Sequence, residues 1–562
     1  MLKLLQFIML ICLLFYFESN VAFSQLYLQW NKTYSGTANN SDDRGNDLVI
    51  DNSGNVIIVG STSTPATGLD FIILKYTSEG DTVWKRTFNT GINNNEEAVS
   101  VAADENNNYY VTGYSYFSGQ QKKIITIKYN SSGNIVWSKV FNYRQDSISN
   151  PAKILINNNG DLYVCGYSQD INGKDALVIK YDAISGDTIW VRTFNNYANR
   201  DDEINAMIID NNQNIVIGGF SSFAPGASDY LLVKFSSDGN FNWVKYYRVL
   251  GTQTNVIYAL KNDLANNIYV TGKTYYYSPG PPGYEGTSYS YSATIKYNEN
   301  GDTLWKKLDG GAHYLEYGAF SLTVDSVGNS FICGNGQATI KTLKYGIDGS
   351  LIWRRFYAPP YNHFGGKGIC VIAGRDNSVY SAGYLPVSDG NGDIFLFKYD
   401  YNNGALLWST SYGSSQNKND ILNKVIIDKF DNIYLLGFFT ASSNDNNILL
   451  LKYNDRPNGI ISNSNIIPGY YSLSQNYPNP FNPLTVINYQ LPASRQGGTI
   501  NNVVNLKVYA ALGKEVATLV NEKQNAGSYS VEFNGEGLPS GVYYYKLEAG
   551  DFVETKRMVL LK

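Results

Sequence analysis

Two histidines are the most versatile side chains of this sequence, because imidazole can bind metals and transfer protons near neutral pH. His313 and His363 lie 21 and 20 residues before Gly334 and Gly383, two glycines that end the same recurring motif. Glu316 is near the first histidine, but a metal site needs a third or fourth ligand and groups that orient them. We therefore expect no metal site and no catalytic residue here, and regard both histidines as loop residues that can contribute to ligand binding.

Tyrosines gather around a stretch rich in proline and glycine, from Tyr275 through Pro281-Pro282 to Tyr291. Tyrosine rings on a stiff loop can stack on sugar rings or grip a peptide. The alternative is a surface loop that packs only on itself. On the first interpretation, the candidate ligand-binding residues are Tyr275, Tyr276, Tyr277, Tyr284, Tyr289, Tyr291, His313 and His363.

Acidic residues form a third candidate group, in the clusters Asp42-Asp43, Glu96-Glu97 and 201–203. They could form a negative rim that binds cations, although such residues are more often solvated loop charges. No EF-hand spacing is present. We predict no bound metal and no cofactor.

The composition excludes several classes of protein. Charged residues make up 16% of the 562 residues and aromatic residues 14%, which favours strands and tight turns over helices. The formal net charge of -4 provides no basic surface for nucleic acid. Beyond the N-terminal segment there are three cysteines, Cys165, Cys333 and Cys370, an odd number that predicts buried free thiols rather than a disulfide framework.

The elements that must position these residues recur along the chain. Successive tryptophans are 54, 53, 53, 53, 62, 48 and 55 residues apart, and no tryptophan lies outside the series. We expect each to anchor the packing between neighbouring repeats. The eight are Trp30, Trp84, Trp137, Trp190, Trp243, Trp305, Trp353 and Trp408.

Two further landmarks share this period. One is a Lys-Tyr pair, as in Lys75-Tyr76, and the other is a glycine that ends motifs such as Asn-Ile-Tyr-Val-Thr-Gly at 267–272. We call the second group the landmark glycines: Gly60, Gly113, Gly166, Gly219, Gly272, Gly334, Gly383 and Gly437.

The landmarks predict four short strands in each repeat. The distance from landmark glycine to lysine varies from 10 to 24 residues, whereas the other segments are nearly constant. In a four-stranded blade, the connections between strands two and three and between four and one lie on one face, which we call the second face. Because variable loops on a rigid scaffold usually carry binding, we place any site on the second face, near the central channel.

The count of landmarks predicts closure. The eighth Lys-Tyr pair, Lys452-Tyr453, is followed by no tryptophan, so the segment around Trp30 must supply the missing fourth strand. The predicted fold is all-β, with an eight-bladed β-propeller over 25–455 that is closed by the N-terminal strand and has no open sheet edge. The repeat resembles the SBBP-type bacterial propeller repeats. Residues 182–190 also resemble the tryptophan-docking repeat of quinoprotein propellers, from which the Lys-Tyr pair departs.

The two ends of the chain differ from the repeats between them. Lys3, the apolar run 4–17 and the sequence Ala22-Phe23-Ser24 predict a signal peptide over 1–24, and no later apolar run is long enough to span a membrane. Residues 456–470 are a predicted linker. Alternation in 485–491, 503–509, 527–533 and 541–547 predicts a small immunoglobulin-like β-sandwich over 471–562.

The C-terminal segment resembles the type A C-terminal sorting domain of the type IX secretion system. The motifs that carry the resemblance are Asn-Tyr-Pro-Asn-Pro-Phe-Asn-Pro at 476–483, Leu-Lys-Val-Tyr at 506–509 and Ser-Gly-Val-Tyr at 540–543, with Ala510 where aspartate is more usual. The resemblance implies contact with the type IX machinery through 471–562 and a secreted or cell-surface protein. We expect a binding module for an extracellular glycan or protein rather than an enzyme.

Two alternatives remain open. One is a propeller enzyme, either quinoprotein-like or glycan-active. In the sialidase box Ser-x-Asp-x-Gly-x-x-Trp the glycine lies three positions before the tryptophan, whereas here Gly239 lies four positions before Trp243. Quinoprotein dehydrogenases often contain two adjacent cysteines, and this sequence contains no such pair. The other alternative is an extracellular structural scaffold.

Overall fold

The computed structural model describes residues 27–561 except for gaps within that range. The gaps are residues 39–40, 66, 92–94, 118–120, 145–146, 197–199, 250–252, 279–285, 313–316, 337–338, 359–365, 375–377, 389–390, 415–418, 443–444, 455–470, 477–478, 493–501 and 525–526. The predicted signal peptide and linker lie outside the described residues. Contacts divide the chain into a unit that includes Trp30–Lys452 and one that includes Tyr453–Lys562.

The first unit consists of repeated four-stranded antiparallel sheets, and its described residues form no helix. The first strands of these sheets are β2 (Arg44–Ile50), β6 (Glu96–Ala103), β10 (Ile148–Ile156), β14 (Asp202–Ile209), β18 (Thr254–Asn262), β22 (Gly318–Val324), β26 (Lys367–Ala373) and β30 (Asp420–Ile427). The second strands are β3 (Val56–Thr64), β7 (Tyr109–Phe117), β11 (Asp161–Asp170), β15 (Ile215–Ala224), β19 (Ile268–Ser278), β23 (Ser330–Gly336), β27 (Ser378–Ser388) and β31 (Ile433–Ser442).

The third and fourth strands complete each sheet. The third strands are β4 (Gly68–Tyr76), β8 (Gln121–Tyr129), β12 (Gly173–Asp182), β16 (Ala227–Phe235), β20 (Thr287–Tyr297), β24 (Thr339–Tyr345), β28 (Asn391–Asp400) and β32 (Asp445–Asn454). The fourth strands are β5 (Thr82–Phe88), β9 (Ile135–Phe141), β13 (Thr188–Phe194), β17 (Phe241–Tyr247), β21 (Thr303–Ala312), β25 (Leu351–Tyr357), β29 (Leu406–Tyr412) and β1 (Tyr27–Tyr34).

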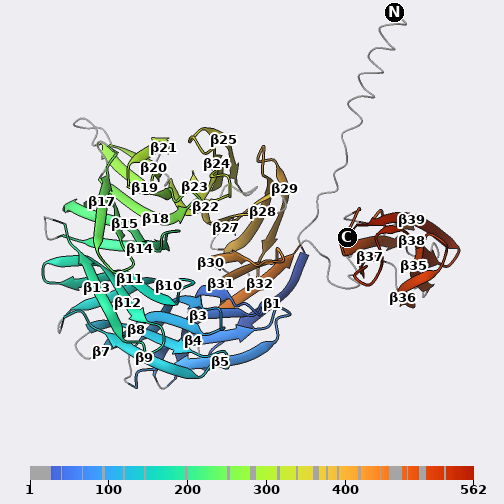
Figure 1. Ribbon diagram of the computed structural model, residues 1–562, viewed down its shortest axis with the longest axis horizontal. Helices are drawn as coiled ribbons and strands as arrows, with labels where there is room; N and C mark the ends of the chain where they lie inside the picture. The colour runs from blue at the N-terminus through green and yellow to red at the C-terminus, as the bar shows by residue number, and fades with distance from the viewer. Residues whose placement is uncertain are drawn as a thin grey trace, which may run out of the picture. The chain divides into compact units, whose positions relative to one another are not determined.

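The sheets are arranged around a common centre, with their first strands innermost (Figure 1). Each first strand contacts the first strand of the next sheet, and β30 contacts β2. In the sheet that contains β30, the outermost strand is β1. It pairs with β32, although the two strands come from opposite ends of this unit's sequence. The N-terminal strand therefore completes the last sheet.

Apolar side chains between neighbouring sheets form the core. One such cluster joins Ile57 and Phe71 of one sheet to Val101 and Tyr109 of the next. Strands β3 and β4 are buried along most of their length, because each lies inside its sheet and is covered by a sheet on both sides. Such strands appear in the sequence as short continuous apolar runs.

Each tryptophan from Trp30 to Trp353 links its own sheet to the following one. The Trp84 indole Nε1 donates a hydrogen bond to the Ser131 carbonyl at 3.1 Å, and the same oxygen accepts one from Lys75 at 3.4 Å. A Cβ on Gly133, whose φ is positive, would lie 2.8 Å from the Trp84 ring. The Gly-x-x-x-Trp and Lys-Tyr landmarks therefore describe one contact between successive sheets.

The same contact joins the two ends of the first unit. Trp30 Nε1 and Lys452 Nζ both donate to the Ser78 carbonyl, at 3.1 and 2.8 Å. A Cβ on Gly80 would lie 3.0 Å from the Trp30 ring. Trp30 and Lys452 thus act on the next sheet as a tryptophan and lysine from one continuous repeat would.

The second unit contains two antiparallel sheets. One has the order β33 (Ser472–Leu473), β34 (Leu484–Leu491), β37 (Gly527–Asn534), and the other β36 (Glu515–Gln524), β35 (Asn502–Ala510), β38 (Gly541–Ala549), β39 (Phe552–Leu560). The four strands predicted by alternation are confirmed, whereas β36 and β39 were not predicted. Side chains from both sheets, including Ile487, Tyr489, Leu506 and Tyr545, form one core.

Candidate ligand-binding site

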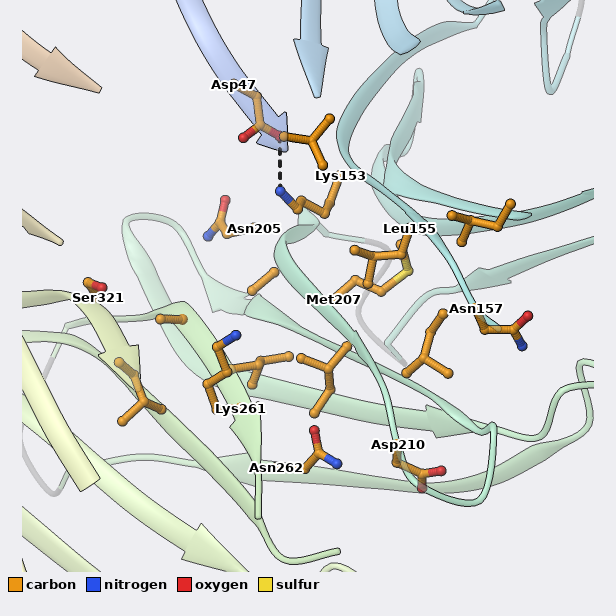
Figure 2. A pocket seen from close by; sticks show the side chains of 18 of the residues that line it. Asp47, Lys153, Leu155, Asn157, Asn205, Met207, Asp210, Lys261, Asn262 and Ser321 are labelled. Carbon is orange, nitrogen blue, oxygen red and sulfur yellow. Dashed lines mark hydrogen bonds and ion pairs between the residues drawn. The ribbon is translucent and has the colours of Figure 1, made fainter. Parts of the chain in front are cut away.

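A cavity of about 1030 Å³ lies among the first strands of the first unit. Side chains from β2, β10, β14, β18, β22 and β30 line it, and it extends to the turns that lead into the second strands, at Asn157 and Asn211. Figure 2 shows Asp47, Lys153 and Lys261 directed into this space from three different strands. We call it the axial cavity. It lies toward the ends of the sheets opposite the second face.

A β-bulge in each first strand shapes the wall of this cavity. In β2 the bulge lies between Gly45 and Asp47, opposite Gly60. It brings the Arg44 carbonyl oxygen to 1.8 Å from the place that a Cβ on Gly60 would occupy, so only glycine fits there. The residues directly after the bulges are Asp47, Ser100, Lys153, Ala206, Ala259, Ser321, Cys370 and Lys424.

Asp47 is the centre of a buried ion cluster. Its carboxylate oxygens lie 3.1 Å from Lys153 Nζ and 3.0 Å from Lys424 Nζ, and one of them accepts a 2.8 Å hydrogen bond from the Ser100 hydroxyl. Burial alone would raise the pKa of Asp47, but the two ammonium groups and the hydroxyl hold it well below its usual range. Asp47 is therefore ionised and is shared by two lysines.

Lys261 has a different environment. Its side chain is exposed to the axial cavity, and no described residue supplies a hydrogen-bond acceptor or carboxylate for its ammonium group. The protein walls reduce its hydration, and together with the nearby Lys424 they lower the pKa of Lys261. The cavity thus holds one lysine whose charge is not compensated by the protein.

The tyrosine-rich stretch is mainly a hairpin, which corrects the predicted loop. Tyr275, Tyr276 and Tyr277 lie in β19, and Tyr289 and Tyr291 lie in β20. Only residues 279–285 between the strands, with Tyr284, lie outside the described residues. Much of the variation in this connection is therefore a longer pair of strands.

The hairpin brings only some of the candidate tyrosines together. Tyr276 pairs with Tyr289 across the strands, and their rings stack with centroids 5.6 Å apart. Tyr291 lies on the same side of the hairpin because side chains alternate along a strand. Tyr275 and Tyr277 face the other side, where the Tyr275 hydroxyl lies 3.1 Å from Ser288 Oγ. His313 and His363 lie outside the described residues.

The acidic clusters hold loops in place. Asp43, Glu96 and Asp202 are fully buried, so the expectation of solvated charges is wrong for them. The Glu96 and Asp202 carboxylates accept hydrogen bonds from the backbone N–H groups of Thr90 and Asn196, at 2.8 and 2.9 Å. Burial raises the pKa of Asp202 to about 6. These carboxylates fasten the connections between the fourth and first strands.

The three cysteines of the described residues are free thiols. Cys165 and Cys333 are buried free thiols, as predicted, and burial raises the pKa of each to about 12. Cys370 is a half-buried free thiol. Among the described residues, no group of three or more His, Cys, Asp or Glu side chains is placed to hold a metal ion.

The lysines of the axial cavity were not predicted from the sequence. Lys153 lies thirteen positions before Gly166, and Lys424 lies thirteen positions before Gly437. Lys261 lies eleven positions before Gly272, where other repeats carry residues such as Leu155 or Ile426. Alignment of the repeats on the landmark glycines, and a search for charges at apolar positions of the first strand, would have found them.

A second missed group consists of aromatic residues that follow the landmark glycines. Tyr114 shows their environment, since Lys122 Nζ lies 3.3 Å from its ring centroid and its hydroxyl donates to Glu97. These side chains are half-buried near the second-face ends of the second strands. They are Tyr114, Tyr167, Phe220, Tyr384 and Phe438.

The motif at 476–483 is anchored to the last strand of the second unit. Phe481 is buried, its N–H donates to the Val559 carbonyl, and its carbonyl accepts from the Leu561 N–H. Residues 475–561 match a family model described as the secretion system C-terminal sorting domain. The second unit is a type IX secretion sorting domain. A protein with this sorting domain is secreted or attached to the cell surface, and the domain is its point of contact with the secretion machinery.

The comparisons with solved structures give distant similarities for the chain as a whole. A quinohemoprotein alcohol dehydrogenase from Pseudomonas putida is 12% identical with a TM-score of 0.44, covering 78% of this chain and 80% of its own. Sqt1 from Chaetomium thermophilum, bound to the N-terminus of a ribosomal protein, is 9% identical with a TM-score of 0.46. The match covers 75% of this chain and 99% of the Sqt1 chain. PorZ, a surface component of the type IX secretion system of Porphyromonas gingivalis, is 11% identical with a TM-score of 0.26. The match covers 92% of this chain and 81% of the PorZ chain.

The search of curated proteins gives no match for this chain. Within the described ranges, no helix has the length and apolar character needed to cross a membrane.

Proposed function

We propose that this protein is an exported, eight-bladed β-propeller that acts as a non-catalytic binding module for an extracellular carbohydrate or protein. The propeller would occupy 25–455, closed by β1, and follow a signal peptide at 1–24. A linker at 456–470 would lead to an immunoglobulin-like sorting domain at 471–562. The contacts of β30 with β2 and the pairing of β1 with β32 support closure.

The observation that carries the binding role is the β19–β20 hairpin. Tyr276, Tyr289 and Tyr291 share one side of this hairpin, and each is half-buried, so each ring has an accessible part. Aromatic rings with an accessible face suit sugar rings and peptide side chains. The hairpin extends toward the second face, where the sequence analysis placed the site.

The test compares binding by residues 25–562 and by variants with altered hairpins. Wild-type protein is applied to a glycan array and to a panel of purified extracellular matrix proteins. We expect the double variant Tyr276→Ser, Tyr289→Ser to lose the binding that wild type shows. Tyr246→Ser, at an exposed tyrosine on β17, should retain it. Hydrolysis of an array glycan by wild type, or equal binding by the double variant, would refute the proposal.

A further inference from the structure

The axial cavity has an excess of positive charge in a protein whose formal net charge is -4. Lys153 and Lys424 share the single carboxylate of Asp47. Asp210 also lines the cavity, but its carboxylate lies 2.7 Å from Lys234 Nζ and is already paired. Three lysines facing one available carboxylate leave two positive charges uncompensated.

The positions of these groups follow from the bulged strands. Asp47, Lys153 and Lys424 occupy the equivalent place directly after the bulge in β2, β10 and β30. Lys261 lies two residues beyond that place in β18, so it is on the same side of its strand. The four side chains therefore converge from different directions on one space, as Figure 2 shows for Asp47, Lys153 and Lys261.

Ammonium groups that face a space walled by protein are stabilised by a nearby counter-charge. Reduced hydration is the main cause that lowers the pKa of both Lys153 and Lys261, and the neighbouring Lys424 lowers each of them further. A bound anion would relieve both effects. The Ser321 hydroxyl, which accepts from the Val371 N–H at 3.1 Å, also lines this space.

We propose that the axial cavity binds a phosphate-type oxyanion, with Lys261 as its main partner and Lys153 and Lys424 as neighbouring positive charges. A doubly charged oxyanion matches the two uncompensated charges. The volume of about 1030 Å³ also leaves room for a small polar molecule that carries the group as a monoester. This site is separate from the tyrosine hairpin and does not depend on the function proposed for that hairpin.

The test uses residues 25–562 and inorganic phosphate as the probe, with heat of binding measured by calorimetry at constant ionic strength. We expect saturable binding that sulfate displaces and chloride does not. Lys261→Gln should weaken the affinity about tenfold, the effect of losing one charge-assisted hydrogen bond. Lys306→Gln, at an exposed lysine on β21, should bind within about twofold of wild type.

Further measurements separate the source of the group from a folding defect. Tighter binding of glucose 6-phosphate than of inorganic phosphate would support a monoester ligand, and equal binding would support the free ion. Because every tryptophan lies in the first unit, unchanged tryptophan emission shows that a variant remains folded. Absence of saturable phosphate binding by wild type, or equal affinity in folded Lys261→Gln, overturns the proposal.

Discussion

The landmark glycines are required by close contact rather than by an unusual torsion angle. None of the eight has a positive φ, but in each a Cβ would lie between 1.8 and 2.2 Å from a carbonyl oxygen of the bulged first strand. The glycines of the Gly-x-x-x-Trp turns differ, because they combine a positive φ with contact to a tryptophan ring. The repeat therefore uses glycine for two separate physical reasons.

Replacement of a landmark glycine by alanine should be more harmful than replacement of a glycine in a strained turn. In Gly219→Ala the new Cβ would lie 1.8 Å from the Glu203 carbonyl oxygen, so the bulge must move. In Gly226→Ala nothing lies within 4 Å, and only the positive φ costs about 1–2 kcal/mol. We expect a clearly larger loss of unfolding free energy for Gly219→Ala, measured by denaturant titration with tryptophan emission. Equal losses would contradict the contact argument.

Asp202 should make stability depend on pH between about 4 and 6. Burial raises its pKa to about 6 in the folded state, so the folded state binds its proton more tightly than the unfolded chain does. Its ionised form therefore destabilises the fold at pH 7, and this effect disappears as the pH falls below 6. We expect the denaturant midpoint of wild type to rise relative to Asp202→Asn from pH 7 to pH 5.

A matched carboxylate tests this pH effect. Asp182 is half-buried, and hydrogen bonds from the N–H groups of Ser185 and Ile184 lower its pKa, so it does not titrate between pH 5 and 7. Asp182→Asn should leave the difference between the two pH values as in wild type. The same slope in wild type and Asp202→Asn would show that Asp202 is not the responsible group.

At the scale of elements, the sheet that contains β1 differs from the others because its strands come from distant parts of the chain. Its closing contacts include the hydrogen bond between the side chains of Asn446 and Asp42, at 2.7 Å. They also include the shared Ser78 carbonyl, which accepts from Trp30 and Lys452. The strand and the tryptophan contact thus close the unit together.

Deletion of residues 27–34 should open the ring. Without β1, β32 becomes an exposed edge that can pair with another molecule. We expect a lower melting temperature and association that increases with concentration, measured by thermal unfolding and by light scattering after size exclusion. Trp30→Phe keeps the strand and loses one hydrogen bond, so it should cost about 1 kcal/mol and remain monomeric. A monomeric deletion variant with unchanged melting would refute this role for β1.

Periodic features could be predicted from the sequence, and contacts between repeats could not. The tryptophan, glycine and lysine landmarks, such as Trp84, Gly113 and Lys75, recur along the sequence, so the strands that carry them could be predicted from their spacing. The axial cavity depends on Lys153 and Lys424, whose side chains meet at Asp47 only because the strands surround one axis. In the hairpin, the proline and glycine residues between the tyrosines indicated a loop, so the length of strands β19 and β20 was not predicted.

At the scale of the whole molecule, the sorting domain should determine export without determining the fold of the first unit. Removal of 471–562 leaves every tryptophan and the contacts around Ser78 in place. We expect the truncated protein to keep wild-type tryptophan emission and melting, but to remain in the periplasm of a host with type IX secretion. Fractionation and immunoblotting measure its location.

A fusion provides the complementary control. Residues 456–562 attached to a signal peptide and a monomeric reporter enzyme should carry the reporter out of the cell. Retention of this fusion, or export of the truncated protein, would contradict the role of the sorting domain.

The way the last sheet is completed also orders events during synthesis. β1 is among the first segments to leave the ribosome, yet its partner β32 is made only after the other sheets, and the Asp42–Asn446 bond spans 404 residues. The sorting domain lies after β32 in the chain. A polypeptide that carries the sorting domain therefore already contains β32, the strand with which β1 pairs.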